Sequence, residues 1–122
     1  MKETYETGLW GEDFAAEYLK EKLGMVLLEQ RYRTKRGEID LIMIDGDTVV
    51  FVEVKTRRTG EKGNGLSAVN LAKQKRITQA ATLYLMQKNW LRKAVRFDLV
   101  EIHGFEVIHI PNAFQPYGKF QH

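Results

Sequence analysis

The sequence predicts an α/β fold in which a mixed sheet is flanked by helices. Two long segments have the periodicity of amphipathic helices, and five short runs rich in Val, Ile and Phe have the alternation of strands. Their order is helix, three strands, helix, two strands, and strands interleaved with long helices favour a mixed sheet covered by those helices. The 122 residues contain no repeat or linker, so we expect one domain over residues 1–122.

The first half of the chain is expected to form one helix and three strands. Apolar residues recur at helical spacing from about Leu9 to Leu23, and Gly24 fits the left-handed position that ends many helices. Asp45-Gly46-Asp47 has the composition of a tight turn between two strands, which makes an antiparallel hairpin. The predicted strands are 25–33, 37–44 and 48–56.

Three side chains of the first helix depart from a simple amphipathic pattern. Glu12 falls inside the apolar stripe, where a carboxylate needs either a functional role or a salt bridge to a Lys or Arg at the core edge. Trp10 and Phe14 lie off the stripe, so another layer or a partner must cover them. The stripe itself is expected to consist of Leu9, Ala15, Ala16, Leu19 and Leu23.

The second half is expected to form a loop, a helix and two strands. The polar, glycine-rich segment 57–65 is predicted to be a loop, and a helix is expected from about Leu66 or Ser67 to Lys88. One face of this helix is polar at its N-terminal end, at Asn70, Lys73 and Gln74, and apolar afterwards. The predicted strands are 96–102 and 105–110, followed by a tail.

The composition narrows the class of protein. An apolar fraction of 43% and a charged fraction of 29% are ordinary for a globular protein. No stretch reaches the roughly 18 apolar residues of a membrane span, and the N-terminus does not resemble a signal sequence. The chain has no cysteine and its three histidines lack ligand spacing, so we expect neither disulfides nor a zinc site, and a cytoplasmic location.

Basic residues gather around the middle of the chain. The net charge is only +3, with 19 basic residues against 16 acidic ones. Three of their four clusters, however, flank the segment 40–55 or follow it directly, as a polyanionic substrate would require. Solvated lysine and arginine faces are the alternative. The candidate nucleic-acid-binding residues are Arg36, Arg57, Arg58, Lys73, Gln74 and Lys75.

Two carboxylates and a lysine are expected to meet at one end of the predicted hairpin. Glu53 and Lys55 lie two residues apart in an apolar strand and therefore share a face. Asp40 lies about as far before the hairpin turn as Glu53 lies after it, so the two carboxylates are expected to be neighbours. Charges in an apolar strand need partners or an ion, although a surface ion-pair cluster remains the alternative.

These residue types suit a hard divalent cation beside a phosphodiester. Asp40 and Glu53 would bind the ion, the carbonyl of Val54 would add an oxygen, and oxygen ligands favour Mg²⁺, or Mn²⁺ as a substitute, over zinc. The ion would activate a water for hydrolysis. Two nearby carboxylates raise the pKa of a lysine, so Lys55 is expected to orient the water or neutralise developing charge rather than act as a base.

The motifs Gly37-Glu38-Ile39-Asp40-Leu41-Ile42 and Phe51-Val52-Glu53-Val54-Lys55-Thr56-Arg57 resemble those of the YraN-like family of small uncharacterised bacterial proteins. That family is similar to the restriction-endonuclease-like PD-(D/E)XK nucleases, especially archaeal Holliday-junction resolvases. The resemblance covers nearly the whole chain and implies a restriction-endonuclease-like α-β-β-β-α-β core. It also implies a metal site at Asp40, Glu53 and Lys55, to which Glu12 contributes. Ile39 stands where the signature has proline.

We therefore expect a Mg²⁺-dependent endonuclease that cuts branched or flapped nucleic acid, with DNA favoured over RNA. A nucleic-acid-binding accessory domain without catalysis is the alternative, and an interaction module built on Trp10, Phe14 and the aromatic tail is a third reading. Symmetric cleavage of two strands would require a homodimer. Two other carboxylates are expected to be structural: Glu38 would pair with a strand arginine, and Asp98 would hydrogen-bond across the sheet.

Overall fold

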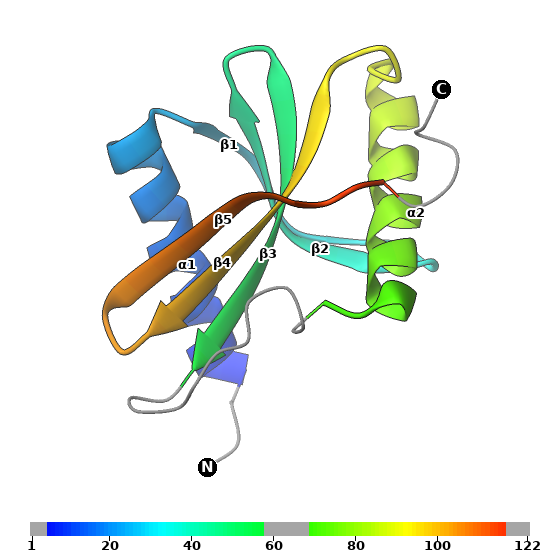
Figure 1. Ribbon diagram of the computed structural model, residues 1–122. Helices are drawn as coiled ribbons and strands as arrows, with labels where there is room; N and C mark the ends of the chain where they lie inside the picture. The colour runs from blue at the N-terminus through cyan, green and yellow to red at the C-terminus, as the bar shows by residue number, and fades with distance from the viewer. Residues whose placement is uncertain (1–4, 58–68, 117–122) are drawn as a thin grey trace.

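The protein is built on a five-stranded sheet with one helix on each face (Figure 1). The computed structural model describes residues 5–57 and 69–116. The strands run in the order β1 (Val26–Arg33), β2 (Glu38–Asp45), β3 (Thr48–Arg57), β4 (Val95–His103) and β5 (Glu106–Phe114). The helices are α1 (Tyr5–Leu23) and α2 (Leu71–Lys88). The predicted α/β class, the mixed sheet and the order α-β-β-β-α-β-β are confirmed.

One strand pair differs from the others. β3 and β4 are parallel, whereas every other neighbouring pair in the sheet is antiparallel. Parallel neighbours need a long crossover, and α2 provides it. This crossover brings the first turn of α2 back beside the C-terminal half of β3. Neither of the helices that the structure describes is long and apolar enough to cross a membrane.

The alternation of β3 divides the interior into two apolar cores. Phe51 and its neighbours face α2, where they pack against Ala80, Ala81 and Tyr84. Val50 and Val52 face α1, where they pack against the small and aliphatic residues of that helix. Both faces of the sheet are therefore buried, which explains why β3 is a nearly continuous apolar run until Glu53.

Helix α1 begins earlier than predicted, at Tyr5 instead of Leu9, and ends as predicted. Gly24 has a φ of 70°, and its amide donates to the carbonyl of Lys20 at 3.0 Å. The expectation that Leu23 is buried was wrong, because the chain turns away at Gly24 and leaves that side chain 44% exposed. Trp10 stacks on Phe14 with ring centroids 5.0 Å apart, and Phe105 packs against both.

Helix α2 starts later than predicted, at Leu71. The side chain of Asn70 accepts a hydrogen bond from the amide of Lys73 at 2.9 Å, so Asn70 is the N-cap rather than an interior residue. The rest of the predicted extension, 66–68, lies outside the described residues. Arg57 was assigned to a loop but is the last residue of β3, and the remainder of that loop also lies outside the described part.

Strand β5 is longer than predicted and includes Pro111. A register shift against β4 and a φ of 53° at Asn112 mark an irregularity next to the proline, which an edge strand tolerates. Phe114 was expected in an aromatic tail, but it stacks on Phe97 at 5.0 Å and packs against the core facing α2. Tyr117 and Phe120 lie outside the described residues.

Asp98 is fully buried and holds β4 to β5. It accepts two hydrogen bonds from Arg96, at 2.9 and 3.1 Å, one from the Asn112 amide at 2.9 Å, and contacts His109 at 2.7 Å. Burial alone would raise its pKa, but these hydrogen bonds outweigh burial and hold the pKa of Asp98 below its usual range. The predicted structural role is confirmed.

We predict that Asp98→Asn lowers the free energy of unfolding by about 3 kcal/mol near neutral pH, because it leaves Arg96 without its buried counter-charge. Since the folded pKa is depressed, the wild-type advantage is present above about pH 4 and shrinks as the pH falls further. Urea unfolding at several pH values measures this. Asp47→Asn, in the exposed hairpin turn, is the control and should change stability by less than about 0.5 kcal/mol; equal losses would contradict the assignment.

Candidate functional site

The regular pairing of the first three strands breaks at Asp40. In the sheet, Leu41 pairs with Val52 and Ile39 pairs with Tyr32. Between these pairs, the regular strand register passes over Asp40 of β2 and Arg31 of β1. Instead, the Asp40 carboxylate accepts a hydrogen bond from the amide of Val54 at 2.8 Å. The side chain thus takes the place of a main-chain acceptor, and β3 continues past the point where its ladder with β2 ends.

Two further irregularities accompany this break: an unusual backbone conformation in β1, and a loss of regular side-chain alternation in β2. Arg31 has a φ of 55°, a left-handed conformation that costs an arginine on the order of 1 kcal/mol. Ile39 packs into the same core as Ile42. Regular strand alternation would place Glu38, Asp40 and Ile42 on one face and Ile39 on the other. This alternation does not hold on the N-terminal side of Asp40, because Ile39 and Ile42 share a core.

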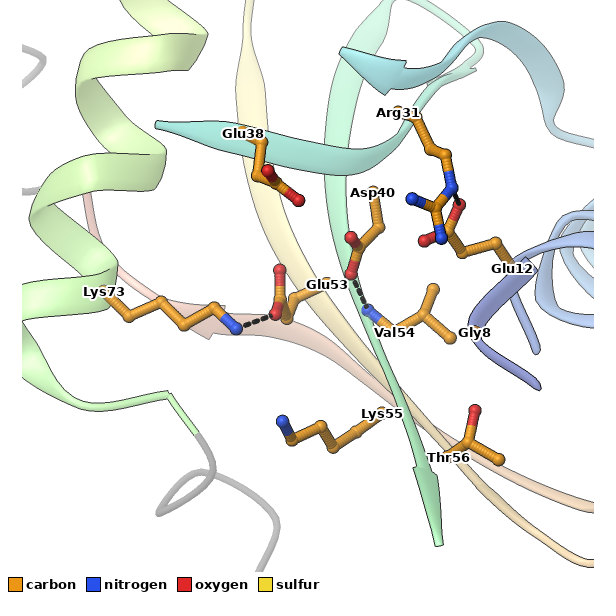
Figure 2. A pocket seen from close by; sticks show the side chains of 10 residues that line it. All are labelled: Gly8, Glu12, Arg31, Glu38, Asp40, Glu53, Val54, Lys55, Thr56 and Lys73. Atoms are coloured by element: carbon orange, nitrogen blue, oxygen red, sulfur yellow. Dashed lines mark hydrogen bonds and ion pairs between the residues drawn. The ribbon is translucent and has the colours of Figure 1, made fainter. Parts of the chain in front are cut away.

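Asp40 and Glu53 meet across this break, as the hairpin register predicted. Continuing the pairing of Leu41 with Val52 by one step places Glu53 beside Asp40, and Figure 2 shows the two carboxylates on neighbouring strands. Burial raises the pKa of Asp40 in spite of the hydrogen bond from Val54. Burial and the charge of Asp40 raise the pKa of Glu53 to about 7. Two carboxylates this close, one buried and one half-buried, favour a cation or a proton.

Lys73, in the first turn of α2, brings a positively charged side chain to the two carboxylates. Its ammonium is ion-paired with Oε2 of Glu53 (Figure 2). Burial disfavours the charged lysine, but Glu53, Asp40 and Glu38 outweigh that cost and raise the pKa of Lys73. Lys73 therefore stays charged and partly neutralises the carboxylate pair.

Glu12 approaches the same place from α1 but is engaged by Arg31. Their Oε1 and Nε atoms lie 3.0 Å apart, and the side chain of Glu12 is 8% exposed. Burial and the charge of Asp40 raise the pKa of Glu12 to about 7. The salt bridge that was the alternative for Glu12 is thus present. Within residues 5–57 and 69–116, no three Asp, Glu or His side chains are gathered closely enough to hold a metal between them.

These side chains line a polar pocket of about 350 Å³. Lys55 points to the same side of β3 as Glu53, and it has no ion-pair partner in the described part of the chain. Contributions come from α1, β1, β2, β3 and α2, so the pocket exists only in the assembled fold. The predicted site residues found together there are Glu12, Asp40, Glu53, Val54, Lys55 and Lys73.

The other candidate nucleic-acid-binding residues lie elsewhere. Arg57 is ion-paired with the buried Glu101 at 3.4 Å, and the side chain of Gln74 donates to the carbonyl of Val69 at 2.9 Å. Lys75 is exposed on α2, and Arg36 is exposed in the turn between β1 and β2. Arg58 lies outside the described residues.

Arg31, which the sequence analysis did not single out, lines the pocket. No local signal marks it, because its role depends on the distant Glu12 and on an unusual backbone conformation. Glu38 pairs with Arg33 as expected, although the 3.9 Å separation and the exposure of both side chains make this contact weak.

The sequence profile of the uncharacterised protein family UPF0102 matches residues 11–102, which include every residue that lines the pocket except Gly8. The chain belongs to this family. A UPF0102 protein of Syntrophus aciditrophicus is 43% identical, with 98% of this chain and 97% of the relative covered. UPF0102 proteins of Herminiimonas arsenicoxydans and Dictyoglomus turgidum are 44% and 41% identical, covering 88% and 89% of this chain and 86% and 97% of theirs. The predicted membership of a family of small uncharacterised proteins is confirmed.

The raised pKa of Glu12 predicts an unusual pH dependence of stability. Between about pH 4.5 and 7 the folded UPF0102 chain holds a proton on Glu12 that the unfolded chain has released, so the contribution of Glu12 becomes less favourable as the pH rises through this window. Glu12→Gln removes this titration. The stability of the variant relative to wild type should rise by on the order of 2 kcal/mol between pH 5 and pH 8.

Thermal or urea unfolding across this range measures the effect. Asp13→Asn is the matched control, because Asp13 is the exposed neighbour on the same helix. A pH dependence of the Glu12→Gln variant that parallels wild type would contradict the raised pKa.

Proposed function

We propose that the chain is a Mg²⁺-dependent endonuclease that hydrolyses phosphodiester bonds in DNA, with branched or flapped molecules as the substrates to test first. The observation that carries the proposal is the pair of carboxylates, half-buried Asp40 and buried Glu53, held side by side at a break in the sheet. The similarity of the two motifs to PD-(D/E)XK nucleases agrees with this placement.

The donor chemistry of the pocket fits a hard divalent cation. Asp40 and Glu53 offer carboxylate oxygens, Val54 offers a backbone carbonyl, and Mg²⁺ completes such sets with water. The raised pKa values of both carboxyls support the fit, since a divalent cation would offset the burial of both groups and the repulsion that Glu53 experiences from Asp40. Bound there, Mg²⁺ would make a water more acidic and offset charge on the scissile phosphate.

The residues of the chain position the reactants. Asp40 is held by the Val54 amide, so its carboxylate is fixed before any ligand arrives. Lys55 lies on the same side of β3 as Glu53 and would neutralise negative charge as water attacks phosphorus. In this hydrolysis one bond forms between the water oxygen and phosphorus, the bond to the leaving oxygen breaks, and the leaving oxygen takes up a proton.

The ion pair between Lys73 and Glu53 gives the non-catalytic alternative specific support. A lysine already neutralises one of the two carboxylates, so the site is partly balanced without any metal. In that reading the domain binds nucleic acid through its basic surface and does not cut. Assays of DNA cleavage and of metal binding distinguish the nuclease from the non-catalytic binding domain.

Nuclease activity is tested with labelled duplex, single-stranded, flap and four-way DNA in Mg²⁺ or Mn²⁺. We expect cleavage that chelation abolishes, and Asp40→Ala or Glu53→Ala should lower its rate by about 100-fold or more, because each removes one of two cation ligands. Asp47→Ala, in the exposed turn, removes a carboxylate outside the pocket and should cut as wild type does. Cleavage that survives Asp40→Ala and Glu53→Ala would reject the proposal.

Metal affinity tests the role of Lys73 separately. Because its ammonium competes with a cation for Glu53, Lys73→Met should bind Mg²⁺ several-fold to about tenfold more tightly in the absence of DNA, as measured by calorimetry. Lys75→Met, on the exposed side of the same helix, removes the same charge and should leave the affinity nearly unchanged. Weaker Mg²⁺ binding by Lys73→Met would contradict the competition.

A further inference from the structure

A second polar pocket adjoins the carboxylate pocket. It has a volume of about 280 Å³ and lies between the turn that joins β1 to β2 and the first turns of α2. Glu38 and Lys73 line both pockets, so these two side chains form the border between them. The lining of the second pocket is strongly basic, because it contains one acidic residue, Glu38, and four basic ones: Lys35, Arg36, Lys73 and Arg76.

The two arginines of this pocket are available to a ligand, whereas Lys73 is ion-paired with Glu53. Arg36 and Arg76 are exposed, and neither forms an ion pair within the part of the chain that the structure describes. The one carboxylate, Glu38, is 62% exposed and lies 3.9 Å from Arg33. Since surface pairs of this kind are weak, the net charge of the pocket is positive.

The backbone that carries these cations is fixed. The hydroxyl of Thr34 accepts hydrogen bonds from the amides of Arg36 and Gly37, both at 3.0 Å, and donates to the carbonyl of Gly37 at 2.9 Å. Gly37 packs directly on α2, because a Cβ at this position would lie 2.6 Å from the carbonyl oxygen of Arg76. The turn is thus seated against the helix, and Arg36 and Arg76 face a shared space from two anchored segments.

We propose that this pocket binds a backbone phosphate of the polynucleotide, next to the phosphate that is cut in the carboxylate pocket. The inference rests on the proposed function for the position of the scissile phosphate. Arginine favours phosphate through planar, paired hydrogen bonds, and two arginines with a lysine converge here. Lys73 borders both pockets, so a strand that crosses from one to the other would pass a lysine between them.

The test is binding of a fluorescent single-stranded or flap DNA, followed by anisotropy over a range of salt concentrations, in EDTA so that neither metal nor cleavage enters. The double variant Arg36→Gln/Arg76→Gln should bind roughly tenfold more weakly than wild type. The slope of log affinity against log salt should fall by about 1, as expected for the loss of one phosphate contact.

The matched control is Lys22→Gln/Arg92→Gln, which removes the same charge from two exposed residues, one in the last turn of α1 and one beyond the end of α2. It should bind nearly as wild type does, and circular dichroism checks that both variants are folded. Equal losses in the two double variants would overturn the proposal, because they would show only a dependence on net charge.

Inorganic phosphate, with ionic strength balanced by chloride, distinguishes a polynucleotide phosphate from the free ion. Weak or absent competition supports the polynucleotide; complete displacement of DNA from wild type by inorganic phosphate would overturn it. The binding result for this pocket can be distinguished from the result of the nuclease test. A specific loss of binding in a protein that never cuts keeps this pocket and rejects hydrolysis, whereas cleavage with unchanged KM in Arg36→Gln/Arg76→Gln keeps hydrolysis and rejects the pocket.

Discussion

The hydrogen bond from the Val54 amide to the Asp40 carboxylate is the contact on which the site depends. It replaces a rung of the ladder between β2 and β3, and it fixes the half-buried carboxylate of Asp40 next to Glu53. The sheet bears a cost for this arrangement, since Arg31 on the neighbouring strand adopts a left-handed conformation and the regular pairing is lost at this point. Such local strain, together with buried like charges, is typical of sites kept for function rather than for stability.

Charge balance explains how the fold tolerates this cluster. Glu12 is offset by Arg31 from β1 and Glu53 by Lys73 from α2. Asp40 is stabilised by the Val54 amide, the charge of Lys73 and a side-chain hydrogen bond with Glu53. The compensation is incomplete, because the pKa values of all three carboxyls remain raised. This incomplete compensation is the basis of the proposed cation site, and the adjoining pocket at Arg36 and Arg76 has the opposite charge. A metal ion and a phosphate chain are complementary to this pair of pockets.

The elements of the site that depend on local sequence could be predicted, and those that depend on long-range packing could not. The turn at Gly46 fixes the hairpin register, so the neighbourhood of Asp40 and Glu53 followed from counting residues. The pairing of Lys73 with Glu53 requires the crossover through α2, and the start of that helix was misplaced because the cap at Asn70 was overlooked. The contact of Arg31 with Glu12 required a backbone break that strand alternation does not anticipate.

The most direct test of the central claim is a crystal structure of the chain soaked in Mn²⁺, with the ion located by its anomalous scattering. We expect a peak between Asp40 and Glu53, within about 2 to 2.5 Å of an oxygen from each carboxylate, with the Lys73 ammonium moved off Glu53. A well-ordered pocket without a peak at a saturating Mn²⁺ concentration, and with the ion pair between Lys73 and Glu53 intact, would contradict the claim that this is a divalent-cation site.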